Sequence, residues 1–140
     1  MNTDDDFIKE FLSSPKRIAI VGASSNPKRA SNEIMKFLMD RGHTIYPIHP
    51  MEQSILGITP TRFLKDLNEV VDGVIIYLSK RNVLSQIEIA VNKSIPLVWL
   101  PLGITSEEGG RIVQSAGLKY IENRCPKIEY KRLELDNKNN

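Results

Sequence analysis

Cysteine is almost absent from this 140-residue chain, and the single one, Cys125, has no partner for an internal disulfide. One cysteine also excludes a metal site made of cysteines alone, and two histidines, His43 and His49, are too few for a histidine-rich zinc site. We therefore expect no bound metal. A hydrophobic core has to stabilise the fold, and 140 residues of which 41% are hydrophobic are enough to build one.

An excess of one charge is also missing, because 19 basic residues are nearly balanced by 17 acidic ones. This balance argues against a general nucleic-acid-binding surface. The longest apolar run, residues 95–104, contains two prolines and is far too short to span a bilayer. The acidic start, residues 1–6, lacks the basic and apolar parts of a signal peptide. We expect a cytoplasmic protein that binds neither nucleic acid nor membrane.

Short apolar segments rich in β-branched and aromatic residues recur along the chain, and helical patterns separate them. The strand-like segments cover residues 17–21, 44–48, 73–78, 96–100 and 119–121. The helical patterns cover residues 31–41, 63–70, 82–92 and 106–116, with a further helix over residues 3–12. This alternation predicts a single α/β domain over residues 1–140, a Rossmann-like three-layer sandwich around a five-stranded parallel sheet of order 3-2-1-4-5. The polar tail, residues 136–140, is expected to fray.

The loop after the first strand, residues 21–31, has the composition of a phosphate cradle. In such folds ligands bind beyond the carboxyl ends of the strands, where the strand order reverses, here between the first and fourth strands. Small residues, hydroxyl donors and positive charges are supplied by Gly22, Ala23, Ser24, Ser25, Lys28, Arg29 and Ser31. The alternative is a tight surface turn with helix caps and two solvated cations. We expect Gly22 to be required for ligand approach while the fold survives its replacement by valine.

The usual dinucleotide fingerprint is missing from this loop, since G-x-G-x-x-G would need glycine at the positions of Ser24 and Pro27. NAD also requires an acidic residue at the end of the second strand, and the segment Pro47–Pro50 has none. NAD is therefore disfavoured, whereas a phosphorylated ribose would be tolerated. Pro47 and His49 are candidates for contacts at this end, and His49 is also compatible with a histidine that caps a loop between two prolines.

The ends of the third and fourth strands supply further candidates. Ser79 and Arg81, at the start of a helix, would face a phosphate or an adenine, or else belong to a solvated helix start. Leu102 and Gly103 follow the fourth strand, where a glycine suits close backbone approach. Trp99 lies inside a strand segment, and we expect it in the core.

Asn123, Arg124 and Cys125 follow the fifth strand and border the same sheet edge. Two interpretations of Cys125 remain open: a reactive thiol favoured by neighbouring cations, or a packed small side chain. No adjacent histidine supports a Cys–His nucleophile.

Five segments, taken in order, resemble the motifs of one family. They are Val-Gly-Ala-Ser-Ser-Asn-Pro-Lys-Arg-Ala-Ser at 21–31, Pro-Ile-His-Pro at 47–50, Val-Asp-Gly-Val at 71–74, Trp-Leu-Pro-Leu-Gly at 99–103 and Asn-Arg-Cys-Pro-Lys-Ile-Glu at 123–129. The ordered set covers roughly residues 16–130 and is similar to the small stand-alone bacterial coenzyme A-binding proteins. These proteins are related to the coenzyme A-binding domain of the succinyl-CoA synthetase α subunit.

The resemblance implies a Rossmann-like domain that binds coenzyme A. By this comparison the first loop meets the phosphates, the end of the second strand lies near the adenosine, and the later loops line the pantetheine arm. Three positions depart from the family pattern: His49 stands in place of asparagine, Pro101 replaces glutamine and so removes a side-chain donor, and Tyr130 replaces a frequent histidine.

The leading hypothesis is a non-catalytic module that binds coenzyme A or an acyl-CoA and acts as a carrier, sensor or regulator. An NADP- or nucleotide-dependent enzyme and a thiol-redox protein acting through Cys125 remain alternatives. An enzyme needs positioned acid–base groups, and the candidate residues include only His49, Cys125 and cations. We assign no catalytic residue, and the sequence indicates no oligomeric state.

Overall fold

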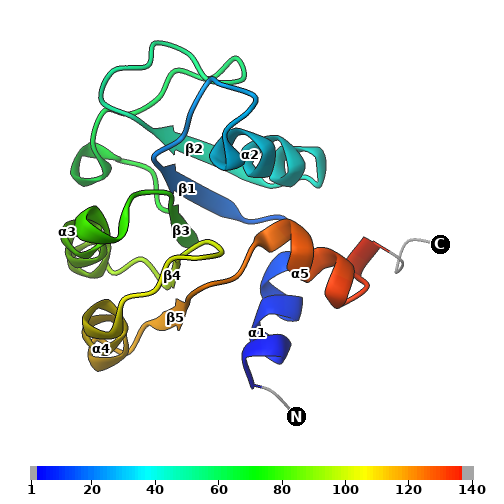
Figure 1. Cartoon of the computed structure of the whole chain (residues 1–140), viewed down its shortest axis with the longest axis vertical. Helices are drawn as coiled ribbons and strands as arrows, with labels where there is room; N and C mark the ends of the chain where they lie inside the picture. The colour runs from blue at the N-terminus through cyan, green and yellow to red at the C-terminus, as the bar shows by residue number, and fades with distance from the viewer. Residues whose placement is uncertain (1–2, 137–140) are drawn as a thin grey trace.

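Helices and strands alternate along the chain and stack into three layers in the computed structural model, which describes residues 3–136 (Figure 1). One parallel sheet contains β1 (Arg17–Val21), β2 (Thr44–Ile48), β3 (Gly73–Ile76), β4 (Leu97–Trp99) and β5 (Lys119–Ile121). One face is covered by α1 (Thr3–Leu12), α2 (Ala30–Asp40) and α5 (Pro126–Arg132), and the other by α3 (Lys80–Asn92) and α4 (Glu107–Ser115). The expected α/β sandwich around a five-stranded parallel sheet is confirmed.

The strand order is β2-β1-β3-β4-β5, which corrects the expected order 3-2-1-4-5. The third strand does not lie beyond the second because Thr61 occupies the outer edge of β2. The Thr61 amide donates to the Pro47 carbonyl at 3.0 Å, and the His49 amide donates to the Thr61 carbonyl at 3.0 Å. Instead β3, all of whose residues are buried, pairs with β1 and β4. The order therefore reverses between β1 and β3, not between the first and fourth strands.

The segment between β2 and β3 differs most from the sequence expectation. Where a helix over residues 63–70 is expected, the structure has only the 3-10 turn η1 (Leu64–Asp66). Eight residues are few for a stable helix, and here Leu64, Leu67 and Val71 are buried from a largely irregular backbone. Residues 49–63 instead form an excursion that lies beside the loop after β1 (Figure 1).

The C-terminal helix α5 is a further difference, because no helix is expected after the fifth strand. Its seven residues are too few for a periodic pattern, although Pro126 at the first turn is a recognised start signal. The last described residue, Asp136, is tied to Arg41 by an ion pair of 2.9 Å. The rest of the tail for which fraying is expected, residues 137–140, lies outside the described residues. Within residues 3–136 no helix is long and apolar enough to cross a membrane.

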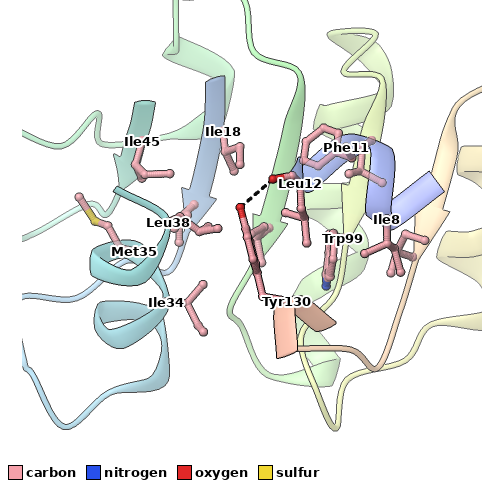
Figure 2. Packing of buried hydrophobic residues seen from close by; sticks show 14 of the residues in the cluster. Ile8, Phe11, Leu12, Ile18, Ile34, Met35, Leu38, Ile45, Trp99 and Tyr130 are labelled. Carbon is pink, nitrogen blue, oxygen red and sulfur yellow. Dashed lines mark hydrogen bonds between the residues drawn. The ribbon is translucent and has the colours of Figure 1, made fainter. Parts of the chain in front are cut away.

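Two hydrophobic clusters fill the spaces on either side of the sheet. The cluster in Figure 2 joins α1, α2 and α5 to one sheet face, with Ile18 and Trp99 among its members. Trp99 is 1% exposed, which confirms its expected place in the core. The second cluster packs α3 and α4 on the opposite face, where Val74 and Val98 are fully buried. Both faces of the short strands are thus covered, which explains why they do not alternate with polar residues.

A buried polar network crosses the first cluster. His43 Nδ1 accepts the Lys16 amide at 3.1 Å, and its Nε2 lies 2.9 Å from the Tyr130 hydroxyl. That hydroxyl donates in turn to the Leu12 carbonyl at 2.7 Å, the bond drawn in Figure 2. These bonds join the end of α1, the approach to β1, the turn before β2, and α5.

Candidate ligand-binding groove

A groove of about 1060 Å³ opens along the carboxyl edge of the sheet. Its walls come from the segments that follow all five strands, together with the first turns of α2, α3 and α5. It therefore lies where open α/β folds bind ligands, at the reversal of strand order between β1 and β3. Among residues 3–136 no group of three or more His, Cys, Asp or Glu side chains is arranged to hold a metal ion.

Nine of the sixteen residues expected at a binding site line this groove. They are Gly22, Ala23, Ser24, Arg29, Ser31, His49, Ser79, Leu102 and Cys125. The other seven do not line it: Ser25, Lys28, Pro47, Arg81, Gly103, Asn123 and Arg124. Pro47 is buried within β2, whereas Lys28 and Arg81 are exposed side chains beside the groove.

The loop after β1 is shaped by its own short polar side chains. Ser24 Oγ accepts the Asn26 amide at 3.0 Å, Asn26 Oδ1 accepts the Lys28 amide at 2.9 Å, and the buried Asn32 donates to the Ser24 carbonyl at 2.9 Å. These bonds fix the path of the loop into α2. Four residues of the groove wall have backbone amides that donate to no protein acceptor among the described residues. They are Ala23, Ser24, Ala30 and Ser31.

Gly22 has a packing role besides the ligand contact expected of it, since it also lines the groove. Its φ is +81°, and a Cβ added there would lie 2.1 Å from the carbonyl oxygen of Tyr77 in the neighbouring loop. The glycine is therefore required where the chain leaving β1 passes against the chain leaving β3. This geometry argues against the expectation that valine at this position would leave the fold intact, because the backbone of the adjacent loop would have to move.

Ser25 is turned away from the groove and toward Glu52, in the excursion after β2. The Glu52 carboxylate accepts both the Ser25 amide, at 2.5 Å, and the Ser25 hydroxyl, at 2.7 Å. These two bonds hold the pKa of Glu52 below its usual range. The carboxylate thus ties the first loop to the segment after β2 and uses the donors that Ser25 would offer an anion.

His49 both caps a loop and lines the groove, so the two interpretations of this residue are compatible. Its Nδ1 accepts the amides of Met51 and Glu52, each at 3.0 Å. Arg62 lines the same wall, and its Nε donates to the Pro50 carbonyl at 3.1 Å. Arg62 is not among the residues expected from the sequence, although it is the only Lys or Arg between residues 49 and 64.

The strand ends on the β5 side hold scaffold residues as well as groove residues. The Arg124 guanidinium pairs at 2.9 Å with Glu129, whose side chain is 4% exposed. The backbone carbonyl of Arg124 accepts a hydrogen bond from Trp99 Nε1 at 2.7 Å. The Asn123 side chain accepts the Gly103 amide at 2.7 Å. The side chains of Asn123 and Arg124 therefore support the loops at this end of the sheet.

Cys125 and Tyr77 lie in the groove near the start of α5. The thiol is half-buried and free. Burial raises the pKa of the Tyr77 phenol far above its usual value, and the neighbouring Cys125 and Glu33 act in the same direction. Tyr77 is therefore protonated at neutral pH, and it lines this part of the groove.

Sequence and structure comparisons place the chain among known proteins. It is 29% identical over 123 residues to the uncharacterized protein YneT of Bacillus subtilis, covering 88% of this chain and 91% of that protein. It is also 28% identical to the α subunit of an ADP-forming acetate–CoA ligase from Pyrococcus furiosus, over 83% of this chain but only 28% of the subunit. The chain therefore corresponds to about a quarter of that ligase subunit.

Solved structures share the fold closely. A hypothetical protein from Pyrococcus horikoshii matches with a TM-score of 0.87 and 31% identity, over 92% of this chain and 91% of that one. A protein from Thermus thermophilus matches with a TM-score of 0.86 and 29% identity, over 95% and 99% of the two chains. The family model described as a CoA binding domain matches residues 16–131, nearly the whole chain. The chain thus belongs to the CoA-binding domain family.

Proposed function

We propose that this chain binds coenzyme A or an acyl-CoA in the groove along the carboxyl edge of the sheet, and that it acts as a non-catalytic carrier, sensor or regulatory module. The observation that carries the proposal is the set of unpaired amides on first-loop residues that line a groove of about 1060 Å³, in a member of the CoA-binding domain family. Amides at a helix start, together with Arg29 beside them, suit the diphosphate of the ligand.

The remaining groove wall suits the elongated arm of the same ligand. Beyond the first loop the lining includes the apolar side chains of Leu78, Leu102 and Ile104, interrupted by a few polar groups at the start of α3. Cys125, at the start of α5, lines the same groove. We therefore place the thiol end of coenzyme A on the α5 side of the groove.

A non-catalytic role is supported by the way the reactive side chains are engaged. His49 Nδ1 is occupied by two backbone amides, so this nitrogen is not available as a base. Tyr77 holds its proton at neutral pH, so it supplies no phenolate base. Within the described residues Cys125 is hydrogen-bonded to no base that would activate it as a nucleophile.

Calorimetric titration with coenzyme A, NAD and NADP tests this function. We expect coenzyme A to bind, NAD to bind more weakly or not at all, and Arg29→Ala to weaken coenzyme A by about 1–3 kcal/mol through loss of a charge-assisted contact. Arg111→Ala is the matched control, because Arg111 is an exposed arginine on α4 outside the groove. Tighter binding of NAD or NADP than of coenzyme A would overturn the proposal in favour of a dinucleotide site.

A further inference from the structure

Arg62 is held in the groove wall with most of its hydrogen-bonding capacity unused. Its Nε donates to the Pro50 carbonyl at 3.1 Å, which anchors the guanidinium to the segment after β2. Its two terminal nitrogens make no hydrogen bond or ion pair with the part of the chain that the structure describes. A guanidinium anchored by Nε presents these nitrogens as a fork, the geometry that matches two phosphate oxygens.

His49 offers a second donor on the same wall. Because Nδ1 accepts two backbone amides, the ring proton of the neutral imidazole sits on Nε2. Nε2 has no protein partner among residues 3–136, and the residue lines the groove. Arg62 and His49 both follow β2, the edge strand of the sheet, so their donors lie on the β2 side of the groove.

The one carboxylate in the segment after β2 belongs to Glu52, and it is hydrogen-bonded to the first loop although its charge still acts on His49. Glu52, between His49 and Arg62 in the sequence, accepts two hydrogen bonds from Ser25, and neither Glu52 nor Ser25 lines the groove. In nucleotide-binding α/β folds an acid after the second strand reads free ribose hydroxyls, whereas an arginine there accommodates a phosphate on the ribose. In this groove the charged residue after β2 is an arginine, Arg62, and no acidic residue after β2 lines it.

We propose that Arg62, assisted by His49, binds a phosphate monoester on the ribose of the ligand and so selects coenzyme A over its 3′-dephospho form. This inference rests on the proposed function, which supplies the ligand, and adds the residues that distinguish its phosphorylated ribose. The diphosphate stays with the amides of the first loop and Arg29, so Arg62 acts on one end of the ligand only.

Calorimetry with two ligands that differ by this single phosphate isolates the contact. Wild-type protein is expected to bind coenzyme A at least about tenfold more tightly than 3′-dephospho-coenzyme A. Arg62→Ala is expected to lower the affinity for coenzyme A by about tenfold or more. Its affinity for the dephospho form is expected to stay within about twofold of the wild-type value, so the preference for coenzyme A is removed. Arg62→Lys keeps the charge without the forked geometry and is expected to retain part of the preference for coenzyme A.

Two controls separate this contact from the rest of the site. Arg29→Ala is expected to weaken both ligands by a similar factor, because both carry the diphosphate. Arg111→Ala is expected to change neither, and an unchanged melting temperature of Arg62→Ala confirms that the exposed side chain is not needed for folding.

The outcomes distinguish the two levels of the proposal. Equal wild-type affinity for the two ligands, or an equal loss of both in Arg62→Ala, overturns the role of Arg62 and leaves coenzyme A binding intact. Absence of binding of both ligands to wild-type protein overturns the proposed function itself, and the role of Arg62 with it.

Discussion

The folded protein favours the neutral form of His43, because its surroundings oppose a second proton on the ring. Nδ1 accepts the Lys16 amide, so protonation there would place two hydrogens against each other. The side chain is buried, and burial followed by the charge of Lys16 lowers the pKa of His43 below its ordinary value of 6.5. The neighbouring Tyr130 adds no charge, since burial raises its pKa to about 12.

The lowered pKa of His43 predicts how stability depends on pH. Between pH 6.5 and the lower folded pKa the unfolded chain binds more protons than the folded one, so the free energy of unfolding falls as the pH is lowered through this window. Above 6.5 this contribution is complete and constant. Urea unfolding from pH 8 to pH 5 is expected to show the decline in wild-type protein and a flatter profile in His43→Gln. A decline of equal slope in both proteins would show that another group titrates.

Two glycines with the same positive φ separate backbone strain from a steric clash. Gly22 and Gly57 both have a φ of +81°, but a Cβ at Gly57 would meet nothing within 4 Å. Gly57→Ala is therefore expected to cost about 1–2 kcal/mol of unfolding free energy, from strain alone. Gly22→Ala adds the contact with the Tyr77 carbonyl and is expected to cost at least about 3 kcal/mol. Equal values in urea unfolding would contradict the packing assigned to Gly22.

At the residue scale, the sequence predicts those contacts that are local along the chain. The groove residues of the first loop were identifiable because a strand followed by small and polar residues and then a helix defines its own geometry. Glu52 and Arg62 were not, because their positions depend on the path of an irregular segment after β2. No periodic pattern marks such a path, and its partners are distant in the sequence.

At the scale of elements, the N-terminus of α4 contains a capping bond that its counterpart in α3 lacks. Ser106 Oγ accepts the Gly109 amide at 3.0 Å, whereas Ser79, which precedes α3, makes no such bond. Ser106→Ala is therefore expected to lower the unfolding free energy by about 1 kcal/mol and Ser79→Ala by a few tenths. Chemical denaturation of both variants compares them directly, and a larger loss for Ser79→Ala would reverse the assignment.

The positions of the strands along the chain could be predicted from the sequence more closely than their order in the sheet. Three strands, β1, β2 and β5, have the expected bounds, and β1 shows why: its buried apolar run lies between Lys16 and Gly22, a signal contained within the segment. The order of the sheet depends on which edge of β2 remains free, and Thr61 occupies that edge through two hydrogen bonds. This competition between distant segments has no counterpart in local composition.

At the scale of the whole molecule, the layers serve to hold five loops at one edge of the sheet. The first cluster and the His43 network secure α1, α2 and α5 on one face, and the second cluster secures α3 and α4 on the other. With both faces covered by packed helices, the carboxyl edge remains as the opening, and it contains the unpaired amides, Arg29, Arg62 and Cys125. We propose that coenzyme A binds at this edge.

Titration of ¹⁵N-labelled protein with coenzyme A, followed through backbone amide signals, tests this assignment most directly. We expect the largest shifts at the amides of Ala23, Ser24, Ala30 and Ser31, smaller shifts along the groove to Cys125, and little change on the outer surfaces of α1 and α4. Saturating coenzyme A that left the first-loop amides unmoved while shifting signals of α1 or α4 would contradict it.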